Sequence, residues 1–86
     1  MKRTKALRKP SPPLTAVLAA NIRAFREAKE LSQEAFADMC GLHRTYVGSV
    51  ERGERNVTLS TLEVFASVLG VSVPQILTGT TPRNDD

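Results

Sequence analysis

The sequence predicts a compact all-α domain of five helices. Apolar residues recur at helical spacing in several stretches, so that each stretch forms one apolar stripe. Four of the five glycines directly follow such a stretch, where helices commonly end. No stretch of useful length alternates apolar and polar residues, as a half-buried strand would. The links between the helices are short, which favours a compact bundle.

The first helix is expected over about residues 13–29. Pro13 suits its first turn, because a proline there removes no hydrogen bond of the helix. The apolar residues of this stretch have the spacing of one helix face, and they are Leu14, Val17, Leu18, Ile22 and Phe25.

Two short helices follow, over about residues 33–40 and 44–52. Ser32 is a good N-cap for the first of them. Gly41 suits its C-terminus, because glycine readily accepts the left-handed conformation. The second has an inward apolar face, which consists of Val47 and Val50.

A loop leads to the fourth helix, for which Thr58 is the capping residue and Gly70 the stop. A fifth, short helix is expected over about residues 73–78, with Ser72 as its cap. The apolar stripe of the fourth helix consists of Leu59, Leu62, Phe65, Ala66 and Leu69.

Charge is unevenly placed and divides the chain into three parts. Five of the twelve basic residues precede residue 10 with no acid among them, whereas residues 14–86 carry seven basic and nine acidic residues. We expect a basic, disordered arm over residues 1–13, a folded domain over residues 14–79 and a polar tail over residues 80–86. The arm suggests a polyanionic partner: either it adds non-specific affinity for DNA, or it is a solvated tail.

The composition argues against several classes of function. Cys40 is the single cysteine, so no internal disulfide can form, which fits a reducing compartment and an expected cytoplasmic location. No apolar run approaches the roughly 18 residues of a membrane span, and none follows the basic N-terminus as in a secretory signal. Cys40 and His43 are too few for a metal site, and no catalytic triad is evident. We therefore expect no enzyme, metal, cofactor, small-molecule ligand or membrane partner.

The tight turn between the second and third helices carries the functional signal. Gly41 at its start lets the two helices cross steeply, so that the third helix protrudes and can enter the major groove of DNA. The segment from Ser32 to Arg52 is therefore predicted to be a helix-turn-helix. Opposite its inward face, the third helix carries three side chains able to hydrogen-bond, namely Arg44, Thr45 and Ser49.

Three motifs resemble those of the Cro/C1-type helix-turn-helix family, also called lambda-repressor-like or XRE-type. They are LSQE at 31–34, TYVGSVERGERN at 45–56 and LGVS at 69–72. The resemblance covers about residues 18–79, and residues 44–56 look most like the controller proteins of restriction–modification systems. His43 departs from the family, which often has a serine as N-cap at this position, and the basic arm departs too.

The resemblance implies that the third helix reads bases. Arg44 would read a guanine, since its guanidinium can donate two hydrogen bonds to O6 and N7, with a phosphate contact as the alternative. Thr45 would meet a thymine methyl or a phosphate, or would simply lie on the helix surface. Ser49 faces the same way one turn further on, and it would reach a base only if the helix lies deep in the groove.

The resemblance also implies a set of contacts to the DNA backbone. Three of these residues have an alternative role in place of a backbone contact. Ser32 could be only a structural cap, Tyr46 a half-buried ring packed on the second helix, and Asn56 a turn residue. For His43, capping or a phosphate contact is favoured over catalysis. The residues expected to contact the backbone are Ser32, Gln33, His43, Tyr46, Arg55 and Asn56.

A salt bridge between the first helix and the end of the third is a further implication of the resemblance. It would join Arg26 to Glu51 and lock the reading helix to the bundle. Arg26 is therefore expected to be structural rather than a DNA contact. Loss of Glu51 should leave the charge of Arg26 without its partner.

The last two helices contain more apolar residues than the predicted apolar stripe that faces the core. We expect them to form a two-fold interface between two copies of the chain, because a single recognition helix covers only half a site. The alternative is that Ile76 and Leu77 merely close the core of the monomer. The expected interface consists of Val64, Val68, Val73, Ile76 and Leu77.

The function that the sequence predicts is sequence-specific binding of double-stranded DNA by a homodimer that regulates transcription. The alternative is an antitoxin-type interaction module that also binds its own promoter. RNA binding is weaker, since the aromatic stacking platforms of single-strand binders are missing.

Overall fold

The computed structural model describes residues 10–79, and the helices in it form an all-α domain. They are α1 (Pro12–Ala28), α2 (Gln33–Cys40), α3 (Arg44–Glu51), α4 (Leu59–Leu69) and α5 (Val73–Leu77). The five predicted helices are confirmed, and no strand occurs among the described residues. Most of the expected arm and the tail 80–86 lie outside these residues.

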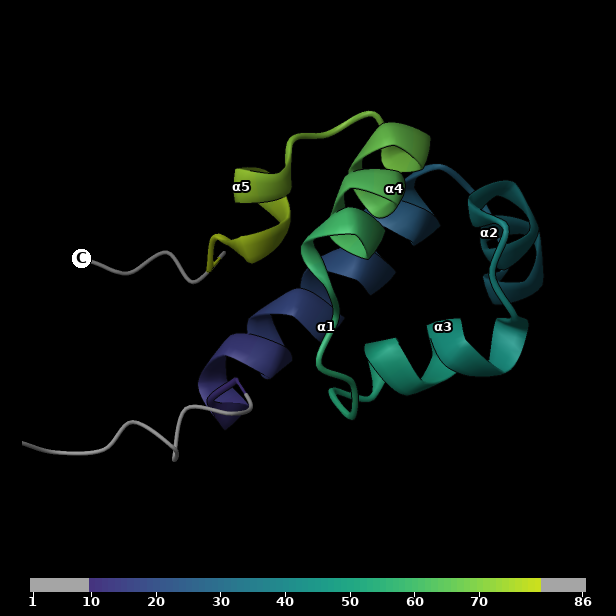
Figure 1. The fold of residues 1–86 in the computed structure, drawn as a ribbon. Helices are drawn as coiled ribbons and strands as arrows, with labels where there is room; N and C mark the ends of the chain where they lie inside the picture. The colour runs from purple at the N-terminus through teal and green to yellow at the C-terminus, as the bar shows by residue number, and fades with distance from the viewer. Residues whose placement is uncertain (1–9, 80–86) are drawn as a thin grey trace, which may run out of the picture.

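The helix-turn-helix lies at one end of the molecule (Figure 1). α2 and α3 stand together there, α5 lies at the other end, and α1 and α4 run between them. α1 is the longest helix and packs against α3, α4 and α5, while α2 packs against α3 and α4. α1 therefore supports α3, α4 and α5 directly, and α2 is held mainly through α3 and α4.

Local capping sets where the helices begin. α1 starts one residue earlier than predicted, because the Ser11 side chain accepts the Leu14 N–H at 3.3 Å and Pro12 takes the first helical position. α1 also ends one residue earlier than predicted, at Ala28, and Glu30 leaves the helix with a left-handed φ of 58°. The cap residues of the five helices are Ser11, Ser32, His43, Thr58 and Ser72.

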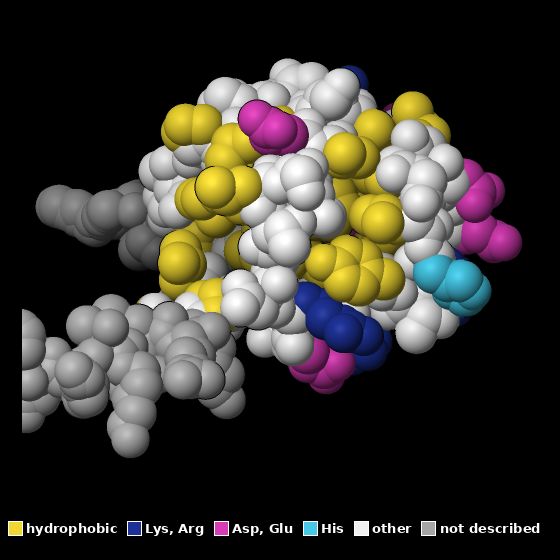
Figure 2. Space-filling view, in the orientation of Figure 1, with side chains coloured by type: hydrophobic (Ala, Val, Ile, Leu, Met, Phe, Trp, Pro, Cys, Tyr) yellow, Lys and Arg dark blue, Asp and Glu magenta, His cyan; other side chains and the backbone are white. Residues whose placement is uncertain are grey.

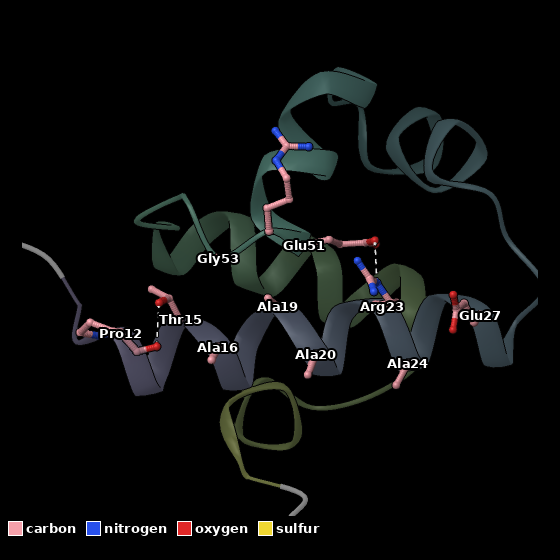
Figure 3. Close-up of a pocket in the computed structure, with 11 residues that line it drawn as sticks. Pro12, Thr15, Ala16, Ala19, Ala20, Arg23, Ala24, Glu27, Glu51 and Gly53 are labelled. Carbon is pink, nitrogen blue, oxygen red and sulfur yellow. Dashed lines mark hydrogen bonds and ion pairs between the residues drawn. The ribbon is translucent and has the colours of Figure 1, made fainter.

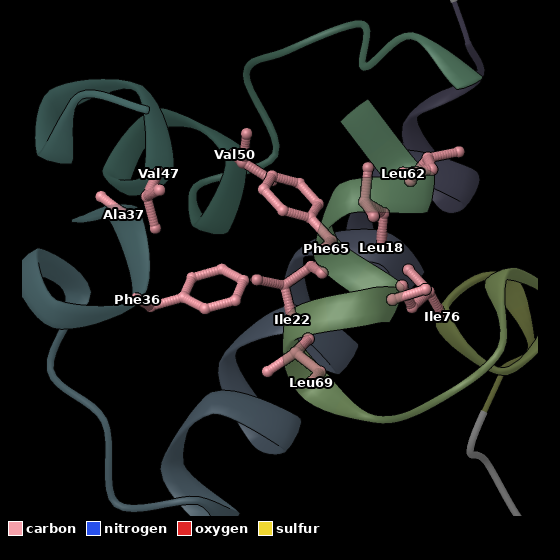
Figure 4. Packing of buried hydrophobic residues seen from close by; sticks show 11 residues of the cluster. Leu18, Ile22, Phe36, Ala37, Val47, Val50, Leu62, Phe65, Leu69 and Ile76 are labelled. Atoms are coloured by element: carbon pink, nitrogen blue, oxygen red, sulfur yellow. The ribbon is translucent and has the colours of Figure 1, made fainter. Parts of the chain in front are cut away.

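The core joins the helix-turn-helix to the rest of the bundle (Figure 4). The ring centroids of Phe36 on α2 and Phe65 on α4 lie 5.5 Å apart, and both side chains are fully buried. The apolar side chains that fill the core are Leu18, Ile22, Phe36, Ala37, Val47, Val50, Leu62, Phe65, Ala66, Leu69 and Ile76.

Two residues of the predicted apolar stripes are not core residues. Leu14 is 43% exposed and Leu59 is 76% exposed. Each lies in the first turn of its helix and precedes the first buried residue, which is Leu18 in α1 and Leu62 in α4. Helical spacing alone does not distinguish such terminal turns from the turns that meet the core.

A buried amide fastens α5 to α1. The Asn21 side chain is 2% exposed, and its Nδ2 donates to the carbonyls of Ile76 at 2.7 Å and Thr78 at 2.9 Å. These carbonyls stand at the end of α5, where a helix leaves its last acceptors without partners inside the helix. Asn21 thus donates hydrogen bonds to the last carbonyls of a helix more than fifty residues away in sequence.

Replacing Asn21 should loosen this attachment. Asn21→Ala is expected to lower the free energy of unfolding by about 1–3 kcal/mol, because it leaves buried carbonyls without a donor. Urea denaturation measures the loss, and amide exchange should show earlier opening of α5. Asn21→Asp keeps the size but not the donor, so it should be destabilised as well; wild-type stability of that variant would contradict the role of the amide.

Candidate nucleic-acid interface

α3 is placed by its buried inner face. Val47 and Val50 are 0% and 1% exposed and belong to the core cluster that also contains Phe36 and Ala37 of α2. Gly41, with a φ of 70°, ends α2 in the left-handed region and lets the chain turn directly into α3. The opposite side of α3, its outer face, is therefore directed away from the core.

Two predicted base readers stand on this outer face. Arg44 and Thr45 are exposed in the first turn of α3. Among the described residues, the guanidinium of Arg44 has no hydrogen-bond or ion-pair partner. His43 precedes them as N-cap, and its Nδ1 accepts the Thr45 N–H at 3.4 Å. The first turn of α3 therefore exposes the guanidinium of Arg44 and the hydroxyl of Thr45 to solvent.

Ser49 is not available on the outer face, which corrects the expectation that it reads a base. Its side chain is buried, with 4% of the residue exposed. The hydroxyl donates to the Tyr46 carbonyl at 2.6 Å and accepts from Nε of Arg55 at 2.8 Å. Arg55 comes from the loop after α3 and covers Ser49, which the residue spacing within α3 could not reveal.

Tyr46 and Arg55 form a joint surface at this end of the molecule. Tyr46 is half-buried against the core, and the guanidinium carbon of Arg55 lies 5.3 Å from the centroid of its ring. That distance is typical of a cation–π contact. On the face of the molecule drawn in Figure 2, a basic patch at the lower edge adjoins hydrophobic side chains, with an acidic side chain directly below it. Tyr46 is thus partly buried, as in the alternative given for it above, and its ring is in contact with Arg55.

The start of α2 holds the next two candidates. The Ser32 hydroxyl accepts the Ala35 N–H at 2.9 Å and so caps α2. Gln33 is half-buried, and its Nε2 donates to Oε1 of Glu51 at 3.0 Å. Asn56 is exposed in the loop before α4.

A buried ion pair connects these elements to α1. Arg26 Nε lies 2.6 Å from Glu51 Oε2, and Arg26 Nη2 lies 3.0 Å from Glu51 Oε1. The two residues are 9% and 5% exposed. Arg26 Nη1 also donates to the Leu31 carbonyl at 2.8 Å, and Arg23 approaches the Glu51 carboxylate to 3.7 Å. The pair thus connects three segments: α1, the connection between α1 and α2, and the last turn of α3.

This pair shifts the ionisation of both partners toward the charged form. Burial alone would raise the pKa of Glu51, but hydrogen bonds from Arg26 and Gln33, together with the charges of Arg26 and Arg23, outweigh it and lower that pKa. The hydrogen bond with Glu51 raises the pKa of Arg26, against the opposing effect of burial. Burial also raises the pKa of the Cys40 thiol to about 11, which favours its protonated form at neutral pH.

A groove of about 610 Å³ runs along α1 beside the end of α3 (Figure 3). Ala16, Ala20 and Ala24 line it, and Figure 3 shows Arg23 and Glu51 turned toward each other. Within residues 10–79, no group of three His, Cys, Asp or Glu side chains could hold a metal ion. None of the helices in that range is long and apolar enough to span a membrane.

The expected interface residues divide into exposed and buried ones. Ile76 is fully buried in the monomer, so its predicted place in an interface between copies is wrong; α1 and α4 cover it. Val64 is 38% exposed, while Val68, Val73 and Leu77 are partly buried against the core. Sequence reasoning missed Met39, which is 57% exposed and shares a groove with Val64 and Val68. Met39 lies off the apolar stripe of α2, and this position could have indicated that its side chain is exposed.

Comparisons with known proteins agree with this geometry. A helix-turn-helix family model matches residues 22–76. The chain is 55% identical over 69 residues to the control protein C.SmaI of Serratia marcescens, covering 80% of this chain and 82% of that protein. A crystal structure of a hypothetical transcription factor from Neisseria superposes with a TM-score of 0.76 at 47% identity over 85% of each chain. The restriction–modification controller protein C.AhdI of Aeromonas hydrophila does so with a TM-score of 0.69 at 40% identity, covering 72% of this chain and 94% of its own.

Removing Glu51 should destabilise the fold strongly. In Glu51→Ala the buried guanidinium of Arg26 loses its partner, and the free energy of unfolding should fall by on the order of 3 kcal/mol. Glu54→Ala is the matched control, because it breaks an arginine–glutamate pair at 3.0 Å whose side chains are 57% and 55% exposed. That control should lose less than about 1 kcal/mol. Equal melting temperatures of Glu51→Ala and wild type would refute the structural role.

The lowered pKa of Glu51 predicts a specific response to acid. Its contribution to stability is complete above the pKa of the unfolded chain and is lost as the pH falls through the lower pKa of the folded state. The free energy of unfolding of the wild type should therefore decline below about pH 5. Glu51→Gln, although less stable at neutral pH, should show a flatter decline over the same range in urea titrations. Parallel curves would exclude this contribution.

Proposed function

Because the chain belongs to the Cro/C1-type (XRE-type) helix-turn-helix family of transcriptional regulators, we propose that it binds operator DNA as a homodimer. Each protomer inserts α3 into the major groove of one half-site. One observation carries the proposal: α3 buries its inner face in the core and leaves Arg44 and Thr45 exposed and accessible at its N-terminal end. That end of a recognition helix is the part that reaches base edges.

Arg44 and Thr45 are the proposed base readers. The guanidinium of Arg44 is the stronger candidate, since its fork matches O6 and N7 of guanine and is already free of internal partners among the described residues. Thr45 offers a methyl group and a hydroxyl, which suit a thymine methyl or a phosphate. With Ser49 buried, the reading set is concentrated in the first turn of α3.

A second set of residues is proposed to hold the DNA backbone. One N–H of the Gln33 amide is used by Glu51, which leaves the other for a phosphate at the N-terminus of α2. Arg55 keeps its charge beside neutral partners and is exposed. The proposed backbone contacts are Ser32, Gln33, His43, Tyr46, Arg55 and Asn56.

Local rather than overall charge supports this arrangement. Residues 10–79 contain six basic and seven acidic residues, so the domain as a whole has no positive excess. Within that range, Arg44 and Arg55 nevertheless have no acidic partner. The basic arm, of which residues 1–9 lie outside the described part, is proposed to add affinity by releasing counterions from DNA.

The relatives favour a role as a controller protein. Two of the three similar proteins described above are named as control or controller proteins, and none of the three is described as an antitoxin. We infer that the chain regulates the transcription of a restriction–modification system. Site occupancy and dimer concentration would set the response.

The homodimer is proposed to form through α4 and α5. Val64 and Val68 on α4 and Val73 and Leu77 on α5 are apolar residues that keep some exposed surface. Two copies joined there would present two α3 helices to half-sites spaced about 34–36 Å, or a multiple of that distance.

Selection from random duplex DNA tests the DNA-binding function. The wild type should enrich a two-fold symmetric site, because two identical recognition helices read two half-sites. Arg44→Ala should weaken binding to that site and lose about 1–3 kcal/mol of discrimination at one base pair in each half-site.

Arg52→Ala is the matched control for Arg44. Arg52 is an exposed arginine at the other end of α3, and Glu54 already neutralises it at 3.0 Å. It should keep the wild-type base preference. Failure of the wild type to enrich any sequence would defeat the proposed function, and an unchanged preference in Arg44→Ala would reduce Arg44 to a phosphate contact.

A charge placed in the proposed interface should separate the protomers. In Val64→Glu, two like charges would face the apolar contact, and the dissociation constant of the dimer should rise on the order of tenfold or more. Sedimentation equilibrium at micromolar concentration measures it. Leu14→Glu introduces the same charge at an exposed apolar residue of α1 and should leave the dimer intact. A monomeric wild type would rule out the interface.

A further inference from the structure

Arg55 is held against α3 by two contacts of different kinds. Its Nε donates to the Ser49 hydroxyl at 2.8 Å, and its guanidinium lies over the Tyr46 ring at 5.3 Å from the centroid. Arg55 belongs to the loop between α3 and α4, where an exposed arginine would otherwise sample many rotamers. We call these two contacts the Arg55 brace.

The direction of the hydrogen bonds in the brace is fixed by chemistry. A guanidinium can only donate and a carbonyl can only accept. The Ser49 hydroxyl therefore accepts from Arg55 and donates its single hydrogen to the Tyr46 carbonyl at 2.6 Å. Since Ser49 is only 4% exposed, its hydroxyl serves this internal chain and is not presented to a ligand.

The neighbouring arginine shows what distinguishes Arg55. Arg52 uses its Nε to pair with the Glu54 carboxylate at 3.0 Å, so its charge is compensated. In the part of the chain that the structure describes, the partners of Arg55 are a hydroxyl and an aromatic ring, and neither compensates its positive charge. Among the described residues, its terminal nitrogens have no partner. The brace thus orders a cation without neutralising it.

We propose that Ser49 and Tyr46 are positioning residues that hold Arg55 ready to bind a phosphate of the DNA backbone beside α3. The inference rests on the proposed DNA-binding function and adds a role for Ser49 that is not base reading. Ordering Arg55 before binding removes part of the entropy that the loop side chain would lose in the complex. Ser49 contributes to affinity only through Arg55.

Affinity and salt dependence separate positioning from direct contact. Arg55→Ala removes one cation, so it should weaken binding and lower the slope of log K against log salt concentration by about one. Ser49→Ala keeps the cation and removes only its partner. It should weaken binding by about 2- to 10-fold, the effect of one side chain that must be ordered, with the wild-type salt slope.

The experiment is a double-mutant cycle on the operator selected by the wild type. Binding of the wild type, Ser49→Ala, Arg55→Ala and the double variant is measured over a range of salt concentrations. Ser49→Ala should have no further effect once Arg55 is alanine, because its only route to the DNA is gone. Arg52→Ala with and without Ser49→Ala is the control cycle, in which the two effects should add.

A measurement without DNA tests the brace itself. The NMR order parameter of the Arg55 Nε–H should be higher than that of Arg52 in the wild type, and it should fall in Ser49→Ala. The thermal stability of that variant should stay close to wild type, because the Tyr46 carbonyl still has a donor in the helix ladder.

Two results would overturn the inference while leaving the proposed function intact. One is equal affinity of wild type and Ser49→Ala, and the other is an equal loss from Ser49→Ala in both Arg55 backgrounds. A wild type that binds no duplex DNA would instead refute the proposed function, and this is seen before any variant is measured.

Discussion

The buried pair of Arg26 and Glu51 is the interaction on which the rest of the structure depends. A buried carboxylate is tolerated only when its oxygens are hydrogen-bonded, and the Glu51 side chain is 1% exposed. Here the donors come from α1 and α2, while Glu51 is the last residue of α3. Three helices must therefore keep one relative arrangement to satisfy a single group. Apolar packing of Val47 and Val50 places α3 on the bundle, and the ion pair fixes how it is turned.

That constraint determines which side chains can face a ligand. With the inner face of α3 committed to the core and its last turn to Arg26, the outer face begins at Arg44 and Thr45. One turn further along α3, Arg55 covers the short Ser49 side chain and contacts Tyr46. The surface there therefore presents an ordered cation and not the Ser49 hydroxyl. The cationic groups of this surface therefore come from two places in the chain, the start of α3 and the loop behind it.

The opposite end of the molecule is organised by a second buried polar group. Asn21 ties the carbonyls at the end of α5 to α1, and Ile76 closes the core beneath them. Because α5 is only five residues long, it would not hold its place without such tertiary contacts. The apolar side chains that remain partly exposed on α4 and α5 belong to the surface that we propose contacts a second copy of the chain.

Local chemistry was enough to predict the five helices, the turn and the inner face of α3. Caps such as Ser32 and Thr58 and the left-handed Gly41 act within a few residues, so a single sequence reveals them. Family resemblance supplied the pairing of Arg26 with Glu51. Tertiary structure alone decided that Ser49 is covered by Arg55 and that Ile76 is buried, because burial depends on which distant segments fold over a residue, and spacing within one helix carries no record of them.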